Sequence, residues 1–146
     1  MNRYKFFILS LTLICVASLS AKDYYATDFG VIADGKTLNT NSIQKGIDFV
    51  NKLGGGRLVF TAGNYLTGSI YLKSNVTLHL EEGATLLGST NPWDYEKDSY
   101  IHWMSMIFAV KQQNIGITGK GTINGRGFKP PTIWWTISSE VSTKTL

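Results

Sequence analysis

The stretch Lys73–Gly88, KSNVTLHLEEGATLLG, decides the fold class of this chain. Within it, Val76–Glu81 alternates apolar and polar residues, and this period of two predicts a strand with one buried face. Glu82-Gly83 interrupts the pattern where a tight corner suits glycine, and Ala84–Leu87 continues as a second short strand. Two strands this short cannot bury an apolar face alone, so the stretch predicts neighbours of the same shape.

The chain supplies such neighbours on both sides. Asn75–Leu78 matches Asn114–Ile117, and after a glycine corner Thr85-Leu86 matches Thr122-Ile123. Arg57–Leu66 is a looser third copy. Recurring short strands with no helices between them predict an all-β fold of stacked coils, a parallel β-helix. Because alternation alone does not give strand direction, an antiparallel sandwich stays open at this point.

One helix is predicted before the strands, over Asn41–Leu53. Asn41 can cap its N-terminus, with Gln44 three residues later completing a capping box. Three glycines at 54–56 end it. Its apolar stripe, read as a packing face, consists of Ile43, Ile47, Val50 and, more loosely, Leu53.

The first residues have the layout of a secretory signal peptide. Arg3 and Lys5 precede an apolar run, Phe6–Leu19, which is shorter than the ~20 residues that a membrane-spanning helix needs. We therefore expect residues 1–21 to be removed by cleavage after Ser20 or Ala21, rather than kept as an anchor. The expected domains are then a β-helix portion over 22–127 and an irregular tail over 128–146, in a protein that is secreted or periplasmic.

Composition excludes several kinds of site. The single cysteine, Cys15, lies in the predicted signal peptide, so no disulfide is expected. Two histidines, His79 and His102, without a further cysteine make no metal cluster, and no cofactor is expected. Without residues 1–21, 12 basic residues face 10 acidic ones, a net charge of about +2 that is compatible with an acidic polymer. The basic residues are scattered, so no nucleic-acid partner is expected, nor any membrane contact after cleavage.

A longer insertion, Thr90–Val110, separates two of the copies. Insertions in a solenoid often project on the binding face, where aromatic rings can stack on sugars. The candidate substrate-binding residues are Trp93, Tyr100 and Trp103. The simpler interpretation, which we favour, is that most of the apolar residues pack into the core, namely Trp103, Met104, Met106, Ile107 and Phe108.

Two apparent motifs are rejected. Gly30–Thr37, GVIADGKT, matches the phosphate-binding loop G-x-x-x-x-G-K-[ST], but the predicted helix starts too late and Asp34 would repel phosphate. Asp94, Glu96 and Asp98 are read as solvated loop carboxylates and not as a catalytic pair. His79, on the outward face of its strand, is expected to be solvated or stacked between coils.

Three stretches together resemble the N-terminal part of glycoside hydrolase family 28, the polygalacturonases and their relatives. They are ATDFGVIADGKTLNTNSIQKGID, GGGRLVFTAGNYLTGSIYLKSNVTLHLEEGATLLGS and NIGITGKGTINGRG. The resemblance implies a right-handed parallel β-helix capped by the predicted helix. It also implies inverting hydrolysis of galacturonate linkages in pectic polysaccharide by carboxyl groups ~6.5–9.5 Å apart, without a cofactor.

The family's catalytic motifs, N-T-D, an adjacent D-D, G-H-G and R-x-K, do not occur in this sequence, so no catalytic residue is assigned. We therefore expect a monomeric N-terminal portion of a secreted polygalacturonase-like hydrolase that is inactive by itself. Two alternatives stay open here: a fragment of a pectate-lyase-type enzyme acting by β-elimination, and a non-catalytic glycan-binding β-helix module.

Overall fold

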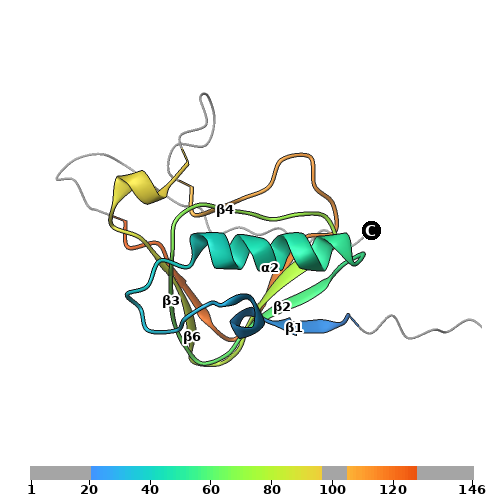
Figure 1. Ribbon diagram of the computed structural model, residues 1–146, viewed down its shortest axis with the longest axis horizontal. Helices are drawn as coiled ribbons and strands as arrows, with labels where there is room; N and C mark the ends of the chain where they lie inside the picture. Colours follow the sequence, from blue (N-terminus) through green and yellow to red (C-terminus); the bar gives the residue numbers. More distant parts are fainter. Residues whose placement is uncertain (1–20, 97–104, 128–146) are drawn as a thin grey trace, which may run out of the picture.

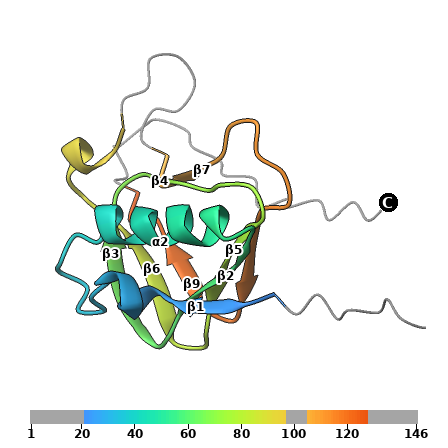
Figure 2. The ribbon, with the colours of Figure 1, turned by 45° about the vertical axis from the view of Figure 1, so that its right-hand side comes forward.

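The computed structural model describes residues 21–96 and 105–127, and its strands form three parallel sheets (Figure 1, Figure 2). Successive coils visit the sheets in the same order, and every pairing among the described strands is parallel. The predicted parallel β-helix is confirmed, and the antiparallel sandwich is excluded. The first sheet holds β1 (Asp23–Tyr25), β2 (Gly56–Phe60), β5 (Val76–Leu80) and β8 (Gly116–Gly119); the second holds β3 (Gly63–Thr67), β6 (Ala84–Gly88) and β9 (Thr122–Asn124); the third holds β4 (Ile70–Tyr71) and β7 (Ile107–Phe108).

Strand β5 lies between the two neighbours that the sequence copies predict. Leu78 is in register with Leu58 of β2 on one side and with Ile117 of β8 on the other. The alternation along β5 is the predicted one, because its apolar side chains are buried and Thr77 and His79 are half-buried. The corner before β6 is made at Gly83, whose φ of 82° is the left-handed conformation that glycine adopts without strain.

The asparagine that begins two of the copies has a structural cause. Asn75 and Asn114 both adopt positive φ, 63° and 54°, at the turn into the first sheet. Asparagine tolerates this region better than most residues. The Asn114 Nδ2 group donates to Asn75 Oδ1 at 3.0 Å, which joins one coil to the next. Just before the looser copy, Arg57–Leu66, Gly55 lies beside Asn75. A Cβ atom added at Gly55 would overlap the Asn75 backbone.

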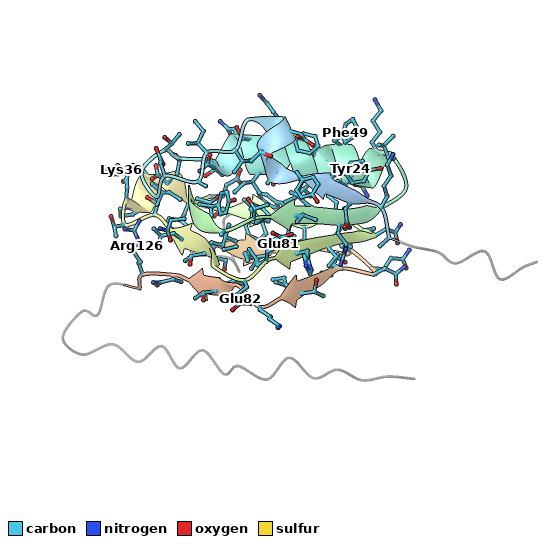
Figure 3. All side chains as sticks on the ribbon, turned by 90° about the horizontal axis from the view of Figure 1, so that it is seen from below. Tyr24, Lys36, Phe49, Glu81, Glu82 and Arg126 are labelled. Atoms are coloured by element: carbon cyan, nitrogen blue, oxygen red, sulfur yellow. The ribbon has the colours of Figure 1, made fainter. Side chains whose placement is uncertain are left out.

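The segment before β2 forms an incomplete coil above the stack. It begins with β1, continues through the short 3-10 helix η1 (Ala26–Phe29) and then runs along β3, where Asp34 bridges to Asn64. The helix α2 (Thr40–Lys52) follows and covers this end of the coils (Figure 3). The predicted capping helix is therefore confirmed, with bounds one residue earlier than expected.

The predicted capping box is wrong. The N-cap residue is Asn39, and its side chain makes no cap hydrogen bond. It is buried and holds the preceding turn instead, accepting from the Ile32 N–H at 2.8 Å and donating to the Ile32 and Thr37 carbonyls. Gln44 does not reach back to the cap because its amide bonds Tyr71. The side chain of Asn39 is thus used by the turn before the helix, and that of Gln44 by a contact 27 residues away.

The apolar stripe of α2 packs as predicted at Ile43, Ile47 and Val50, which are fully buried. Leu53 does not join it and is 54% exposed, because the helix ends at Lys52. Gly46 lies on the buried side, where a Cβ atom would stand 3.0 Å from Leu58 and 3.1 Å from Phe29. The missing side chain therefore lets α2 lie close to β2.

Polar side chains of α2 satisfy the backbone edge of the coil below. Thr40 Oγ1 accepts from the Gly68 N–H at 2.8 Å. The Asn51 amide donates to the Ser74 carbonyl at 2.9 Å, and Gln44 bonds β4 between these two points. A helix thus closes one side of the first complete coil, where a strand would otherwise pair, and buried polar groups remain satisfied.

The opposite end of the described stack is open. Ile117 of β8 and Ile123 of β9 are 43% and 45% exposed. Their partners one coil above, Leu78 and Leu86, are fully buried. In Figure 3 the cap lies at one end of the stack and the last two strands at the other. Apolar side chains are therefore covered from one end only within the described residues.

Several predictions fall outside the described residues. The predicted signal peptide does so except for Ala21, and the predicted tail, 128–146, does so entirely. Within the described ranges, no helix is long and apolar enough to cross a membrane.

Candidate functional site

After β6, the insertion begins with a loop over residues 89–96 that internal hydrogen bonds hold in shape. Asn91 Oδ1 accepts from the Trp93 N–H at 3.1 Å and caps the short 3-10 helix η2 (Pro92–Asp94). The Asp94 carboxylate accepts a short hydrogen bond from the Ser89 hydroxyl and another from the Asn91 amide at 3.2 Å. Asp94 therefore holds the loop in shape, which is a structural role that local sequence did not indicate.

Two further hydrogen bonds hold this loop and the end of β6, from which the loop starts. The Tyr95 hydroxyl donates to the Ser89 carbonyl at 2.7 Å, and burial raises the pKa of Tyr95. Arg126, which follows β9, donates through Nε to the Gly88 carbonyl at 2.8 Å. The Tyr95 bond therefore closes the loop on itself, while Arg126 ties the coil that follows to the end of β6.

The absence of a side chain at Gly68 lets the loop over residues 89–96 lie against the corner after β3. The loop carbonyl of Asp94 accepts from the Ser69 N–H at 3.4 Å, and a Cβ atom at Gly68 would overlap that same carbonyl oxygen. Since Gly68 also donates its N–H to Thr40, the loop, the corner after β3 and the start of α2 meet here.

A cleft of about 290 Å³ opens where these three elements meet. Trp93 lines this cleft, and 77% of its surface is exposed. Glu96 accepts a short hydrogen bond from the Tyr71 hydroxyl, and its N–H donates to Ser69 Oγ at 3.0 Å. The lining residues are Leu38, Thr40, Asn41, Ser69, Trp93, Asp94, Tyr95 and Glu96.

This arrangement places an aromatic ring and several polar groups around one cleft. An exposed indole beside hydroxyl, amide and carboxylate groups offers one stacking face and several hydrogen-bonding partners. Asp94 and Glu96 both line the cleft, and each carboxylate already accepts a hydrogen bond from a neighbouring hydroxyl. Among residues 21–96 and 105–127, no group of three or more metal-ligating side chains is assembled.

The substrate-binding role predicted for Trp93, Tyr100 and Trp103 stays a prediction, although one of the three can be placed in the structure. The structure places Trp93 on the cleft, while Tyr100 and Trp103 lie outside the described residues. Of the residues interpreted as core, Phe108 is buried and Met106 and Ile107 pack against the core; Trp103 and Met104 also lie outside the described part. The contribution of Leu38, Thr40 and Asn41 was missed, because only the fold brings the start of α2 to the loop.

The remaining candidates have structural roles. His79 Nδ1 lies 2.8 Å from Thr118 Oγ1 on the next coil, which is the stacked position expected of it. In the apparent phosphate loop, Asp34 accepts from the N–H groups of Lys36 and Thr37 at 2.8 and 2.7 Å. These bonds lower the pKa of Asp34 to about 2 and occupy the amides that a phosphate would need. Rejection of that motif is consistent with this geometry.

Comparison with known proteins agrees with the sequence resemblance, although no protein-family model matches the chain. The exo-poly-alpha-D-galacturonosidase of Dickeya chrysanthemi is 41% identical over 70% of this chain and 19% of its own length. The family 28 exopolygalacturonase of Yersinia enterocolitica is 41% identical over 73% of this chain and 21% of that one, with a TM-score of 0.63.

The predicted resemblance to glycoside hydrolase family 28 is confirmed. The hyperthermoactive exopolygalacturonase of Thermotoga maritima adds a third similarity, 31% identical with a TM-score of 0.66 over 71% of this chain and 25% of that structure. The right-handed β-helix implied by the resemblance is confirmed with it. This polygalacturonase-like chain spans about a fifth to a quarter of the length of these relatives.

Proposed function

We propose that this chain is a portion of a secreted polygalacturonase-like hydrolase acting on pectic polysaccharide, and that the described coils bind the polymer without cleaving it. The observation that carries the binding role is the Trp93 cleft, which is lined by the loop, the corner after β3 and the start of α2. The similarity to exopolygalacturonases supports the substrate class.

The absence of a role in cleavage rests on the occupied carboxylates. Asp23 pairs with Arg57, Asp48 with Lys73, and Asp34 is bound within its own turn. Glu81 and Glu82 are exposed at the corner after β5, away from the cleft residues. None of these described groups forms the opposed acid–base pair that inverting hydrolysis requires.

Binding and hydrolysis are tested separately on the full chain. Calorimetry with oligogalacturonates should show binding that Trp93→Ala weakens by about tenfold or more and Trp93→Phe largely retains, since a stacked ring contributes about 1–3 kcal/mol. Tyr25→Ala removes an aromatic side chain that is 46% exposed on β1, away from the cleft, and serves as the matched control. Binding that is unchanged in Trp93→Ala would contradict the cleft assignment.

Incubation of the same chain with polygalacturonate should release no reducing sugar. Clear release would show that the chain cleaves the polymer by itself and would contradict the second half of the proposal. Unsaturated, ultraviolet-absorbing products would instead favour the lyase alternative. Binding without products is the expected result.

Export and monomeric state belong to the same proposal. The basic and apolar segment at the N-terminus supports removal of residues 1–21 on secretion. The intact mass of chain recovered from the periplasm or medium of an expressing bacterium should begin at Ala21 or Lys22, and its sedimentation should be that of one copy. Recovery of the full-length mass from the membrane fraction would contradict export by cleavage.

A further inference from the structure

The outward face of α2 has an unusual composition for a helix that caps a stack. Lys45, Phe49 and Lys52 follow one another at helical spacing on this face, and all three are exposed. Phe49 is 44% exposed, although a phenylalanine is usually buried. This face, Lys45–Phe49–Lys52, is called the cap face below.

Phe49 is held in position by other rings. Its centroid lies 5.8 Å from that of Tyr24 in an edge-to-face arrangement and 5.3 Å from that of Phe29. Lys22 Nζ stands 5.2 Å from the centre of the Tyr24 ring. Figure 3 shows Phe49 and Tyr24 together at one end of the molecule, away from Lys36 and Arg126. The cap face therefore adjoins a fixed aromatic cluster with an ammonium group beside it.

The charge around the cap face is positive. Asp48, the acidic residue of α2, is paired with Lys73 at 2.9 Å, and Asp23 is paired with Arg57 at 2.6 Å. Lys22, Lys45 and Lys52 form no ion pair with a carboxylate of the described residues. Asp28 on η1 is the one nearby acidic side chain outside these pairs within the described part.

The cap face is continuous with the cleft. Asn41 lines the cleft and precedes Lys45 by about one turn of the same helix face. From Lys45 to Lys52 the helix rises roughly 10 Å, at 1.5 Å per residue. A chain that leaves the cleft along α2 therefore meets an amide, a lysine, an aromatic ring and a second lysine in turn.

We infer that the cap face extends the Trp93 cleft as a binding track for an acidic polysaccharide. The carboxylates of the polysaccharide are bound by Lys45 and Lys52, and one of its sugar rings packs on Phe49 and the adjoining Tyr24. This inference rests on the proposed function, because it takes the same polymer. An apolar protein partner fits less well, since it would remove the lysine charges from water without pairing them.

The test compares short and long ligands on the full chain. Affinities for a galacturonate trimer and for a galacturonan of about 20 residues are measured by calorimetry at low ionic strength. We expect Lys45→Gln/Lys52→Gln to lower the affinity for the long ligand about 5- to 10-fold, as removal of two exposed charge contacts should, and to leave the trimer unaffected. The loss should be much smaller at about 0.5 M salt, where screening is strong.

Controls separate charge from folding. Lys120→Gln removes an exposed lysine at the open end of the stack and should bind both ligands as wild type does. Lys45→Arg/Lys52→Arg should retain the affinity, and thermal unfolding should be unchanged in all these variants. Sedimentation of the wild-type chain and of Phe49→Ser tests whether a second copy covers this face instead.

The outcomes are distinct for the two proposals. Equal wild-type affinity for the trimer and the long galacturonan, or an unaffected Lys45→Gln/Lys52→Gln variant, overturns the track, while Trp93→Ala sensitivity would still support the cleft. A dimer that Phe49→Ser dissociates also overturns the track. Wild-type chain that binds neither ligand overturns both proposals.

Discussion

The side-chain amide of Gln44 on α2 bonds both backbone groups of Tyr71 on β4, accepting from its N–H at 2.9 Å and donating to its carbonyl at 3.2 Å. A primary amide carries the same donor and acceptor as a peptide group, so one glutamine here replaces one residue of a pairing strand. This relationship lets a helix end a sheet without leaving buried backbone groups unpaired.

Replacement of Gln44 by leucine should lower the free energy of unfolding by about 1–3 kcal/mol, because both Tyr71 groups lose their partner. Gln44→Glu keeps an acceptor for the Tyr71 N–H and should lower the free energy of unfolding by less than Gln44→Leu near neutral pH. Gln113→Leu makes the same change at an exposed position and is the matched control. Chemical denaturation measures the difference; equal stability of the Gln44→Leu and Gln113→Leu variants would show that the bridge is dispensable.

Gly68→Ala should release the loop over residues 89–96, because its Cβ would overlap the Asp94 carbonyl oxygen. The expected cost is about 1–3 kcal/mol, typical of overpacking against backbone. Limited proteolysis should then cut within 89–96 faster than in wild type. Gly125→Ala, with no atom within 4 Å of the added carbon, should change neither property. A Gly68→Ala variant with wild-type protection would show that the loop adjusts without loss.

Asp34 should make stability fall in acid. Its backbone bonds from Thr37 and Lys36 lower its pKa from 3.8 to about 2. A lowered folded-state pKa stabilises fully above the unfolded value of 3.8, and this contribution is lost as pH falls toward about 2.

The melting temperature of wild type should therefore decrease from about pH 4 to pH 2 more steeply than that of Asp34→Asn, which has no charge to lose. Near pH 6 the Asp34→Asn variant should be the less stable of the two. Asp28→Asn, also an exposed carboxylate in the N-terminal segment, should keep the wild-type profile. Parallel wild-type and Asp34→Asn profiles would contradict the assignment.

The open end of the stack should limit solubility. Ile117→Thr/Ile123→Thr keeps two β-branched residues in strands and reduces exposed apolar surface, so light scattering should show less association than in wild type. The equivalent Leu78→Thr/Leu86→Thr change, one coil above, should instead unfold the chain because both side chains are fully buried. If the isoleucine variant also unfolds, that end of the stack is covered in solution.

The strands were predictable because their signal is local. Burial in β5 follows directly from alternation at Val76, Leu78 and Leu80, and the matching Asn75 and Asn114 mark equivalent turns. Repetition favoured parallel strands, because it stacks like strands on like strands, but the antiparallel sandwich was excluded only by the observed pairings. These features depend on residues within one coil and its copy.

The cap and the cleft were less predictable because their contacts join distant residues. Gln44 fits a local capping box, yet it bonds a residue 27 positions away. Asp94 has the sequence context of a solvated loop residue, and no local pattern shows that its backbone carbonyl lies against Gly68. Trp93 was a candidate because it is aromatic and lies in the insertion between two copies, and the residues that line the cleft with it became apparent only from the fold.

A helix on one end and exposed isoleucines on the other give the described stack a direction of growth. New strand pairs can be added below β8 and β9, whereas α2 has already used the backbone groups above β4. Because synthesis also proceeds from the N-terminus, the capped coil is complete before the coil that pairs with it emerges. A later coil can then pair with strands that are already present, which is the order of pairing that we expect during synthesis.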